Sequence, residues 1–207
     1  MTANDLDTAH LFALAAALGW ASGVRLYLVV FLTGLAGALG WVDLPPGLHL
    51  LESPLVLGAS AILATIEFVA DKIPAVNAVW DGLHTVVRVP GGALLAAGVF
   101  GGDPTQWQLV AALAGGALAA TSHVAKTTAT ASLATFPEPV THTGISLVSD
   151  LAVPVMLWLA FTHPVLFAVA LVVVLAGMIG TSVVLFRFLR ALVRRLTGRG
   201  RDVVQNP

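Results

Sequence analysis

Long apolar runs, separated by short connections rich in glycine and proline, dominate the chain. Six such runs can be drawn: residues 10–39, 54–72, 84–101, 107–135, 144–161 and 164–188. A bilayer core of about 30 Å is crossed by about 20 helical residues. We therefore predict an all-α, polytopic integral membrane protein with about six transmembrane helices.

The first and fourth runs are longer than a straight, perpendicular span requires. Each has a polar middle, at residues 19–25 and 121–128 respectively, so these helices either tilt strongly or are interrupted there. The second and fifth runs each carry a carboxylate followed by a proline. This pattern is consistent with an inverted 3+3 repeat with interrupted first and fourth helices, as in many transporters, and equally with a bundle that has no internal symmetry.

Composition supports membrane insertion and excludes a soluble globular protein. Hydrophobic residues make up 57% of the chain and charged residues 10%, and the mean hydropathy is +0.92. We expect one transmembrane domain at residues 1–190 and a basic cytoplasmic tail at 191–207. Cysteine is absent, which excludes disulfides, thiolate metal sites and a cysteine nucleophile.

The distribution of basic residues predicts the orientation. Six of the ten lie near the end of the chain: Arg187, Arg190, Arg194, Arg195, Arg199 and Arg201. Connections 40–53, 102–106 and 162–164 contain no Lys or Arg. Because cytoplasmic loops are enriched in these residues, six spans with both termini in the cytoplasm are expected. The tail is interpreted as an orientation signal that contacts anionic lipid, and nucleic-acid binding is not expected.

A polar stripe interrupts this apolar background in the second and third runs. It comprises Glu67, Asp71, Asn77, Asp81, His84 and Arg88, at spacings that place most members near one side of a helical path. Pro74 predicts a break within the stripe. Residues 71–88 are thus either a solvated cytoplasmic loop or a re-entrant polar site. Glu67 differs, because an ionisable group inside an apolar run is a functional candidate by default.

Further ionisable residues lie inside other runs. Arg25 needs a buried carboxylate partner, for which Glu67 or Asp150 is predicted, and the pair has either a functional or a structural role. In the fourth run, His123 is interpreted first as a satisfied interior histidine. Lys126 lies among hydroxyl residues that are interpreted as a packing face. The pairs Gly91-Gly92 and Gly115-Gly116 predict close helix crossings. The candidates for binding a solute or ion are Arg25, Glu67, Asp71, Asn77, Asp81, His123, Lys126 and Asp150.

One stretch of the stripe carries a family resemblance. The pattern Glu67-x5-Ile73-Pro74-x2-Asn77-x3-Asp81, together with Gly23-x-Arg25 and Gly115-Gly116, resembles domain of unknown function 4126. The resemblance implies a multi-span protein of the bacterial cytoplasmic (inner) membrane and supplies no activity or substrate. That family often has Asp at the position of Asn77 and Glu near that of Asp150.

Three functions are compatible with these observations. The first is a transporter or channel for a small polar or ionic solute, in which Glu67 and Asp150 bind a cation or proton. The second is a membrane scaffold or assembly protein, in which the charges only hold helices together. The third is a magnesium-dependent, lipid-processing enzyme. Phosphate-loop, dinucleotide, metalloprotease and serine-hydrolase patterns are absent, so no cofactor, metal or catalytic residue is assigned. The lipid bilayer is the expected partner, and homo-oligomerisation is left open.

Overall fold

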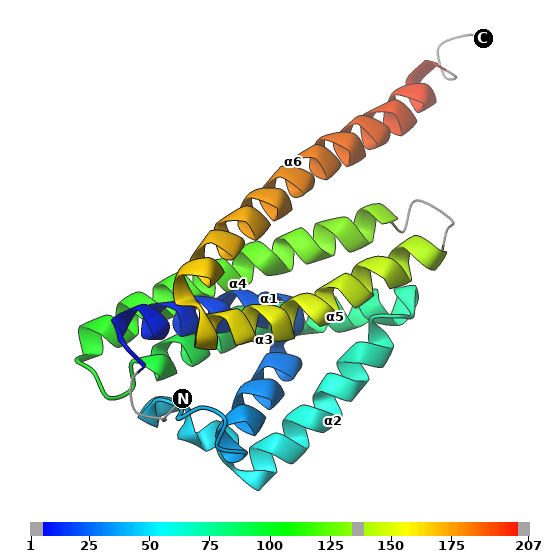
Figure 1. Ribbon diagram of the computed structural model, residues 1–207. Coiled ribbons are helices and arrows are strands. Elements are labelled where there is room, and N and C mark those ends of the chain that lie inside the picture. Colours follow the sequence, from blue (N-terminus) through cyan, green and yellow to red (C-terminus); the bar gives the residue numbers. More distant parts are fainter. Residues whose placement is uncertain (1–5, 134–138, 203–207) are drawn as a thin grey trace.

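The computed structural model describes residues 6–133 and 139–202, which contain helices and no strands (Figure 1). In chain order the helices are α1 (Thr8–Ala38), the 3₁₀ helix η1 (Pro46–Glu52), α2 (Pro54–Ala70), α3 (Pro74–Val99), α4 (Thr105–Leu133), α5 (Pro139–Thr162) and α6 (Pro164–Asp202). The all-α prediction is confirmed. Its six apolar runs correspond to the six α-helices.

The helices are long and apolar enough for a polytopic membrane protein. Within the described residues, four helical stretches are long and apolar enough to cross a membrane: Thr8–Ala38, Val79–Val99, Thr105–Thr130 and Pro164–Arg187. The η1–α2 pair, bent by 69°, adds a fifth as a broken span or re-entrant loop, and Leu147–Thr162 is a shorter apolar helix. The count of six spans and the inverted repeat stay predictions.

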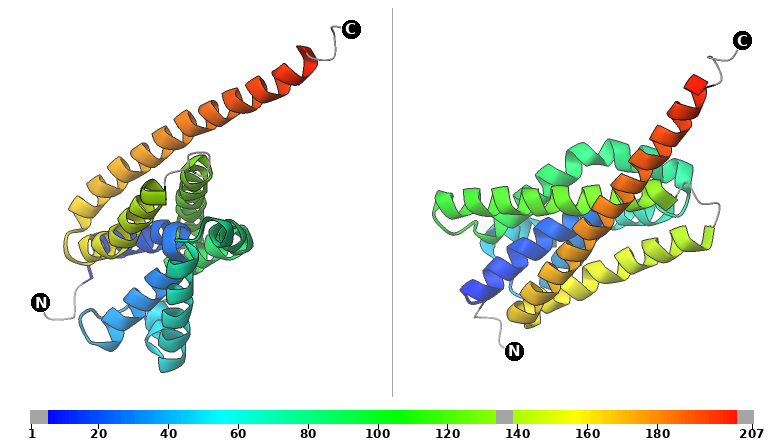
Figure 2. Two further views of the ribbon diagram at one scale, coloured as in Figure 1. Left: turned by 90° about the vertical axis from the view of Figure 1, so that its right-hand side faces the viewer. Right: turned by 90° about the horizontal axis from the view of Figure 1, so that it is seen from above.

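The first half of α1 occupies the centre of the molecule. It packs against α3, α4 and α5, while α6 lies across the outside and its C-terminal part projects away (Figures 1 and 2). Leu14, Leu18 and Trp20 of this half-helix are buried. The outer helices expose apolar side chains instead, as is expected of faces that contact lipid.

Helix α1 is broken at Arg25, whose φ of −148° and ψ of 78° are not helical. The predicted interruption of the first helix is confirmed. A hollow of about 250 Å³ is lined by Leu11 before the break, by Pro46 after it and by Asp103 of the α3–α4 connection. The ring of Phe12 also lies 6.0 Å from that of Trp107, near the start of α4. The start of α1 and the connection that follows its end therefore lie at the same end of the molecule.

Helix α4 runs without a break from Thr105 to Leu133, so the predicted interruption of the fourth helix is wrong. Its hydroxyl side chains bond to the carbonyl groups of their own helix. Thr121 Oγ1 donates to Ala117 O at 2.8 Å, and Thr127 Oγ1 donates to His123 O at 3.0 Å. Such back-bonding satisfies the hydroxyl groups within their own helix.

Glycines bring α1, α3 and α4 into close contact, as predicted. A Cβ added to Gly19 of α1 would lie 2.6 Å from the Gly115 Cα of α4. One added to Gly92 of α3 would lie 2.7 Å from the Ala119 Cβ. Small residues allow such backbone approach between membrane helices. The three helices thereby form a tight unit around the break.

Gly23 provides a test of this packing. An added Cβ would overlap Ala119 O and the Ser122 hydroxyl, which donates to Trp20 O at 2.7 Å. We expect Gly23→Ala to destabilise the protein by about 1–3 kcal/mol through overpacking, seen as a lower thermal midpoint in detergent. Gly58→Ala is the matched control, because its Cβ meets nothing within 4 Å. Equal midpoints for the two variants would contradict the prediction.

Candidate functional site

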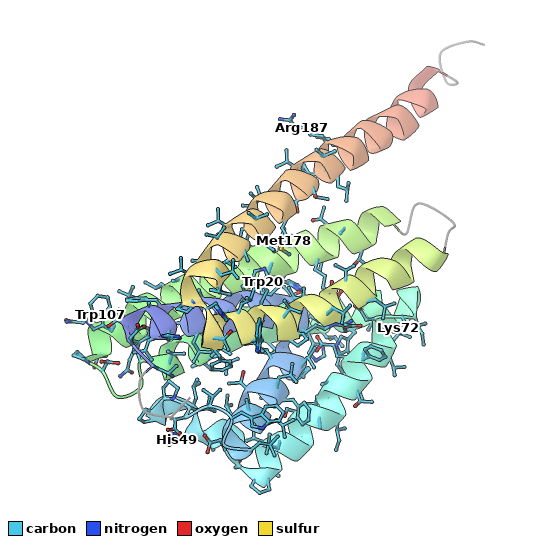
Figure 3. The ribbon with its side chains drawn as sticks, viewed as in Figure 1. Trp20, His49, Lys72, Trp107, Met178 and Arg187 are labelled. Atoms are coloured by element: carbon cyan, nitrogen blue, oxygen red, sulfur yellow. The ribbon has the colours of Figure 1, made fainter. Side chains whose placement is uncertain are left out.

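Ionisable side chains from five helices and one connection meet beside the break in α1. We call this set the charged network: Arg25, Glu67, Asp71, Lys72, Asp81, Arg88, His123, Lys126 and Asp150. It draws on α1 to α5 and on the short α2–α3 connection. Lys72, labelled in Figure 3, marks its position near the end of α2. The break predicted at Pro74 is confirmed, since α2 ends at Ala70 and α3 begins at Pro74.

Arg25 is held by two carboxylates. Its Nη2 lies 2.7 Å from Asp71 Oδ2 and 2.5 Å from Asp150 Oδ1, so the predicted pairing with Asp150 is confirmed. The alternative partner, the carboxylate of Glu67, pairs with Arg88. Arg25 Nη1 instead donates to the backbone carbonyl of Glu67 at 3.2 Å. Asp71 was missed as a partner because it lies one turn beyond Glu67, and only the rotation of α2 decides which of the two faces Arg25.

Arg88 forms the most deeply buried part of the network. Its Nη2 lies 2.7 Å from Glu67 Oε1 and its Nη1 lies 2.8 Å from Asp81 Oδ1. Arg88 and Glu67 are each 1% exposed. The solvated-loop interpretation of residues 71–88 is therefore wrong, since residues 74–88 are helical and Asp81 and Arg88 are buried. The side chain of Asn77 lies outside the described residues. His84 stacks on Trp80 at 4.1 Å between ring centroids.

Hydrogen bonding determines the tautomer of His123. Arg88 Nη1 lies 3.2 Å from His123 Nδ1, and an arginine can only donate, so Nδ1 accepts. The ring proton is thus on Nε2, which lies 2.8 Å from Thr85 Oγ1. Thr85 in turn donates to Asp81 O at 2.8 Å. His123 is a neutral histidine with both nitrogens satisfied, which agrees with its interpretation from sequence.

Lys126 connects the network to the broken helix. Its Nζ lies 2.9 Å from Asp71 Oδ1 and donates to Val24 O at 3.3 Å. Val24 directly precedes the break, where a helix leaves carbonyl groups without an amide from the next turn. The C-terminal end of a helix favours a cation. Lys126 therefore caps the first half of α1.

The residues of the sequence pattern thus lie together in three dimensions. Gly23 and Arg25 are at the break, and Glu67 and Asp81 share Arg88. The model of the family described as Domain of unknown function (DUF4126) matches residues 12–183. The chain belongs to this family. No curated protein and no solved structure matches it.

The DUF4126 chain balances its buried charges. Ion pairs join four carboxylates (Glu67, Asp71, Asp81 and Asp150) to four basic groups (Arg25, Lys72, Arg88 and Lys126), so the ionised network carries no net charge. Arg88 lies about 17 Å along α3 from Val99 at a rise of about 1.5 Å per residue, a distance inside a hydrocarbon core. The network reaches its more exposed edge at Lys72 and Asp150, whose side chains are 26% and 14% exposed.

The carboxylates of this DUF4126 chain face cations rather than one another. A magnesium site needs several oxygen ligands around one point, whereas Glu67 faces Arg88 and Asp71 faces Arg25. Among the described residues no group of three or more His, Cys, Asp or Glu side chains could hold a metal ion. The paired acidic motifs of the sequence are thus engaged in ion pairs with Arg25 and Arg88.

One carboxylate oxygen in the centre is unsatisfied. Glu67 Oε2 is buried and has no hydrogen-bond partner among residues 6–133 and 139–202, and the same holds for Arg88 Nε. Buried polar atoms almost always have a partner. The DUF4126 chain thus presents an acceptor at the core of the network that is available to a proton, a cation or a water molecule. Sequence gave no signal for this feature, because it depends on which oxygen faces Arg88.

Proposed function

We propose that the protein transports a small ionic or polar solute across the membrane through the charged network. The observation that carries the proposal is the convergence of buried ionisable side chains on a broken helix. Intramembrane ionisable residues mark ion pathways and proton relays. A purely apolar bundle would have no need of them.

The helix ends support this role. Substrate and coupling-ion sites of many transporters lie where discontinuous helices expose unpaired backbone groups. Here the first half of α1 ends at Val24, whose carbonyl meets Lys126. α2 ends beside it, and the Glu67 carbonyl meets Arg25. Breaking an ion pair in this network would leave a backbone carbonyl or a carboxylate ready to receive a solute ion.

Glu67 is the group that we assign to proton or cation binding. Its Oε1 is held by Arg88 at 2.7 Å, while its Oε2 is buried and unsatisfied. A proton on Oε2 would neutralise the carboxyl group without removing the contact at Oε1. Asp150, near the exposed edge, would pass ions between this interior and the aqueous phase.

A scaffold role is the alternative, and the neutrality of the network favours it. Buried ion pairs often hold helices in one register without any further activity. In that case neutralising a residue would change stability and abundance without changing any flux. The two functions therefore differ in one measurable quantity.

The Glu67→Gln variant distinguishes transport from a scaffold role. Purified protein in liposomes with entrapped pyranine reports proton entry under a potassium diffusion potential, and ²²Na⁺ and ³⁶Cl⁻ uptake report other small ions. We expect the wild-type flux to fall by about tenfold or more in Glu67→Gln, because a proton-accepting group contributes at least that much to proton transfer. The amide keeps an oxygen for Arg88.

Glu52→Gln is the matched control, because Glu52 lies in η1, outside the charged network. It should leave the flux unchanged. If wild-type liposomes take up none of the three ions faster than protein-free liposomes, transport of these ions is excluded and the scaffold role remains. Intact flux in Glu67→Gln would remove Glu67 from the mechanism.

We further propose an orientation in the bacterial cytoplasmic membrane. The start of α1 and the connection that follows its end lie with the α3–α4 connection, and residues 1–24 contain no Lys or Arg. The start of α1 is therefore placed outside, while the arginine-rich end of α6 stays in the cytoplasm. This orientation is the alternative to the expected cytoplasmic N-terminus, which stays a prediction. In it, α1 is a re-entrant pair of half-helices rather than a span.

A further inference from the structure

A second site lies between the first half of α1 and helices α4, α5 and α6. It is a cavity of about 400 Å³, a volume within the range of small-molecule sites. Its walls are mainly apolar and include Trp20, Ala129, Ala152, Val174 and Met178, with Lys126 at its inner side. Trp20 is fixed in the wall, since its indole Nε1 lies 3.5 Å from Met178 Sδ. Figure 3 labels both residues, which come from α1 and α6.

Lys126 supplies the polar group of this cavity. The side chain is 5% exposed and its ammonium group carries three donors. Two of them are accounted for among the described residues, by Asp71 and Val24. The ammonium group can donate to a further acceptor as well. Because Lys126 lines the cavity, a ligand there can supply this acceptor.

The net charge of the charged network determines whether an anionic or a neutral acceptor suits Lys126. The network that contains Lys126 already sums to zero, so an anionic ligand would add an uncompensated charge to a site of low dielectric constant. A neutral oxygen accepts the same hydrogen bond without that cost. The apolar walls require the rest of the ligand to be apolar. Val148 and Gly177, on α5 and α6, line the cavity and are exposed on the outer surface, which gives access from the lipid phase.

We propose that this cavity binds an uncharged, lipid-soluble molecule with a carbonyl oxygen, which accepts from Lys126 while its apolar part packs against Trp20 and Met178. The cavity shares Lys126 with the charged network, and its other walls lie outside that network. It requires only that Lys126 keep its present contacts.

Fluorescence quenching of Trp20 tests the proposal. The full chain in detergent is titrated with methyl 11-bromoundecanoate, whose bromine quenches indole fluorescence, and the signal is the part that is lost in Trp20→Phe. We expect saturable quenching with a half-saturation concentration about tenfold lower than for 1-bromoundecane, which lacks the oxygen. No saturable Trp20 quenching by the ester overturns the proposal. Tighter binding of 11-bromoundecanoate, the free anion, overturns the choice of a neutral ligand.

Two glycines of α6 give matched variants that leave Lys126 and the charged network untouched. Gly177 lines the cavity and Gly180 does not, and an added Cβ meets nothing within 4 Å at either position. Gly177→Leu should raise the half-saturation concentration for the ester by about tenfold or more, as expected when a side chain fills the site, and Gly180→Leu should not. Equal binding by the two variants overturns the assignment of the cavity. Ion flux in Gly177→Leu, measured in parallel, reports separately on the proposed function.

Discussion

Replacing Arg88 with methionine should destabilise the protein by about 3–5 kcal/mol, because removal of one partner leaves buried charges uncompensated. Two carboxylates depend on this guanidinium, Glu67 at 2.7 Å and Asp81 at 2.8 Å. Both would remain in a site with little access to water. The measurement is the free energy of unfolding in mixed micelles as the SDS fraction is raised.

Lys72→Met is the matched control for this change. Lys72 pairs with Asp150 at 3.4 Å at the exposed edge of the network, and exposed pairs contribute at most about 1 kcal/mol. Its loss should therefore have a small effect. An Arg88→Met variant as stable as Lys72→Met would show that the interior carboxylates do not depend on Arg88.

A triple variant separates stability from activity. Adding Glu67→Gln and Asp81→Asn to Arg88→Met removes the stranded charges, which cause most of the cost of the single change. We expect most of the lost stability to return. If ion flux stays absent in this stable variant, the charges serve transport. Unchanged flux would assign them to the scaffold role.

The predictions that succeeded from sequence rest on strong local constraints. Pro74 cannot continue a helix, so the break between α2 and α3 was visible directly. A cation as deep as Arg25 requires a carboxylate, and Asp150 is one. Gly115 and Gly92 mark helix crossings because nothing larger than hydrogen fits there. For the proline and the glycines, one residue type leaves a single structural solution.

The predictions that failed depend on rotation and on competing partners. Glu67 and Asp71 lie on neighbouring turns, so the sequence alone left open which would face Arg25. Residues 74–88 look like a loop by composition, yet Arg88 neutralises the polar side chains and lets them be buried. The hydroxyl groups of α4 look like a weak point, yet they are satisfied by their own helix. Tertiary partners determined each outcome.

The position of the N-terminus is the second prediction with a large effect. The chain has no cysteine, so single cysteines can be introduced and labelled with a membrane-impermeant maleimide in intact cells. Ala9→Cys, at the exposed start of α1, should be labelled as completely as Asp103→Cys in the α3–α4 connection. Ile73→Cys, exposed at the α2–α3 connection, should be labelled only after the membrane is permeabilised.

The reason is geometric. If α1 crossed the membrane once, its two ends would be separated by about 30 Å of hydrocarbon. The structure instead places Leu11 and Pro46 around one hollow beside Asp103. If Ala9→Cys, like Ile73→Cys, were labelled only after the membrane is permeabilised, α1 would have to straighten at Arg25. Straightening would pull the Arg25 side chain away from Asp71 and Asp150. The same result would therefore remove the broken helix on which the charged network is built.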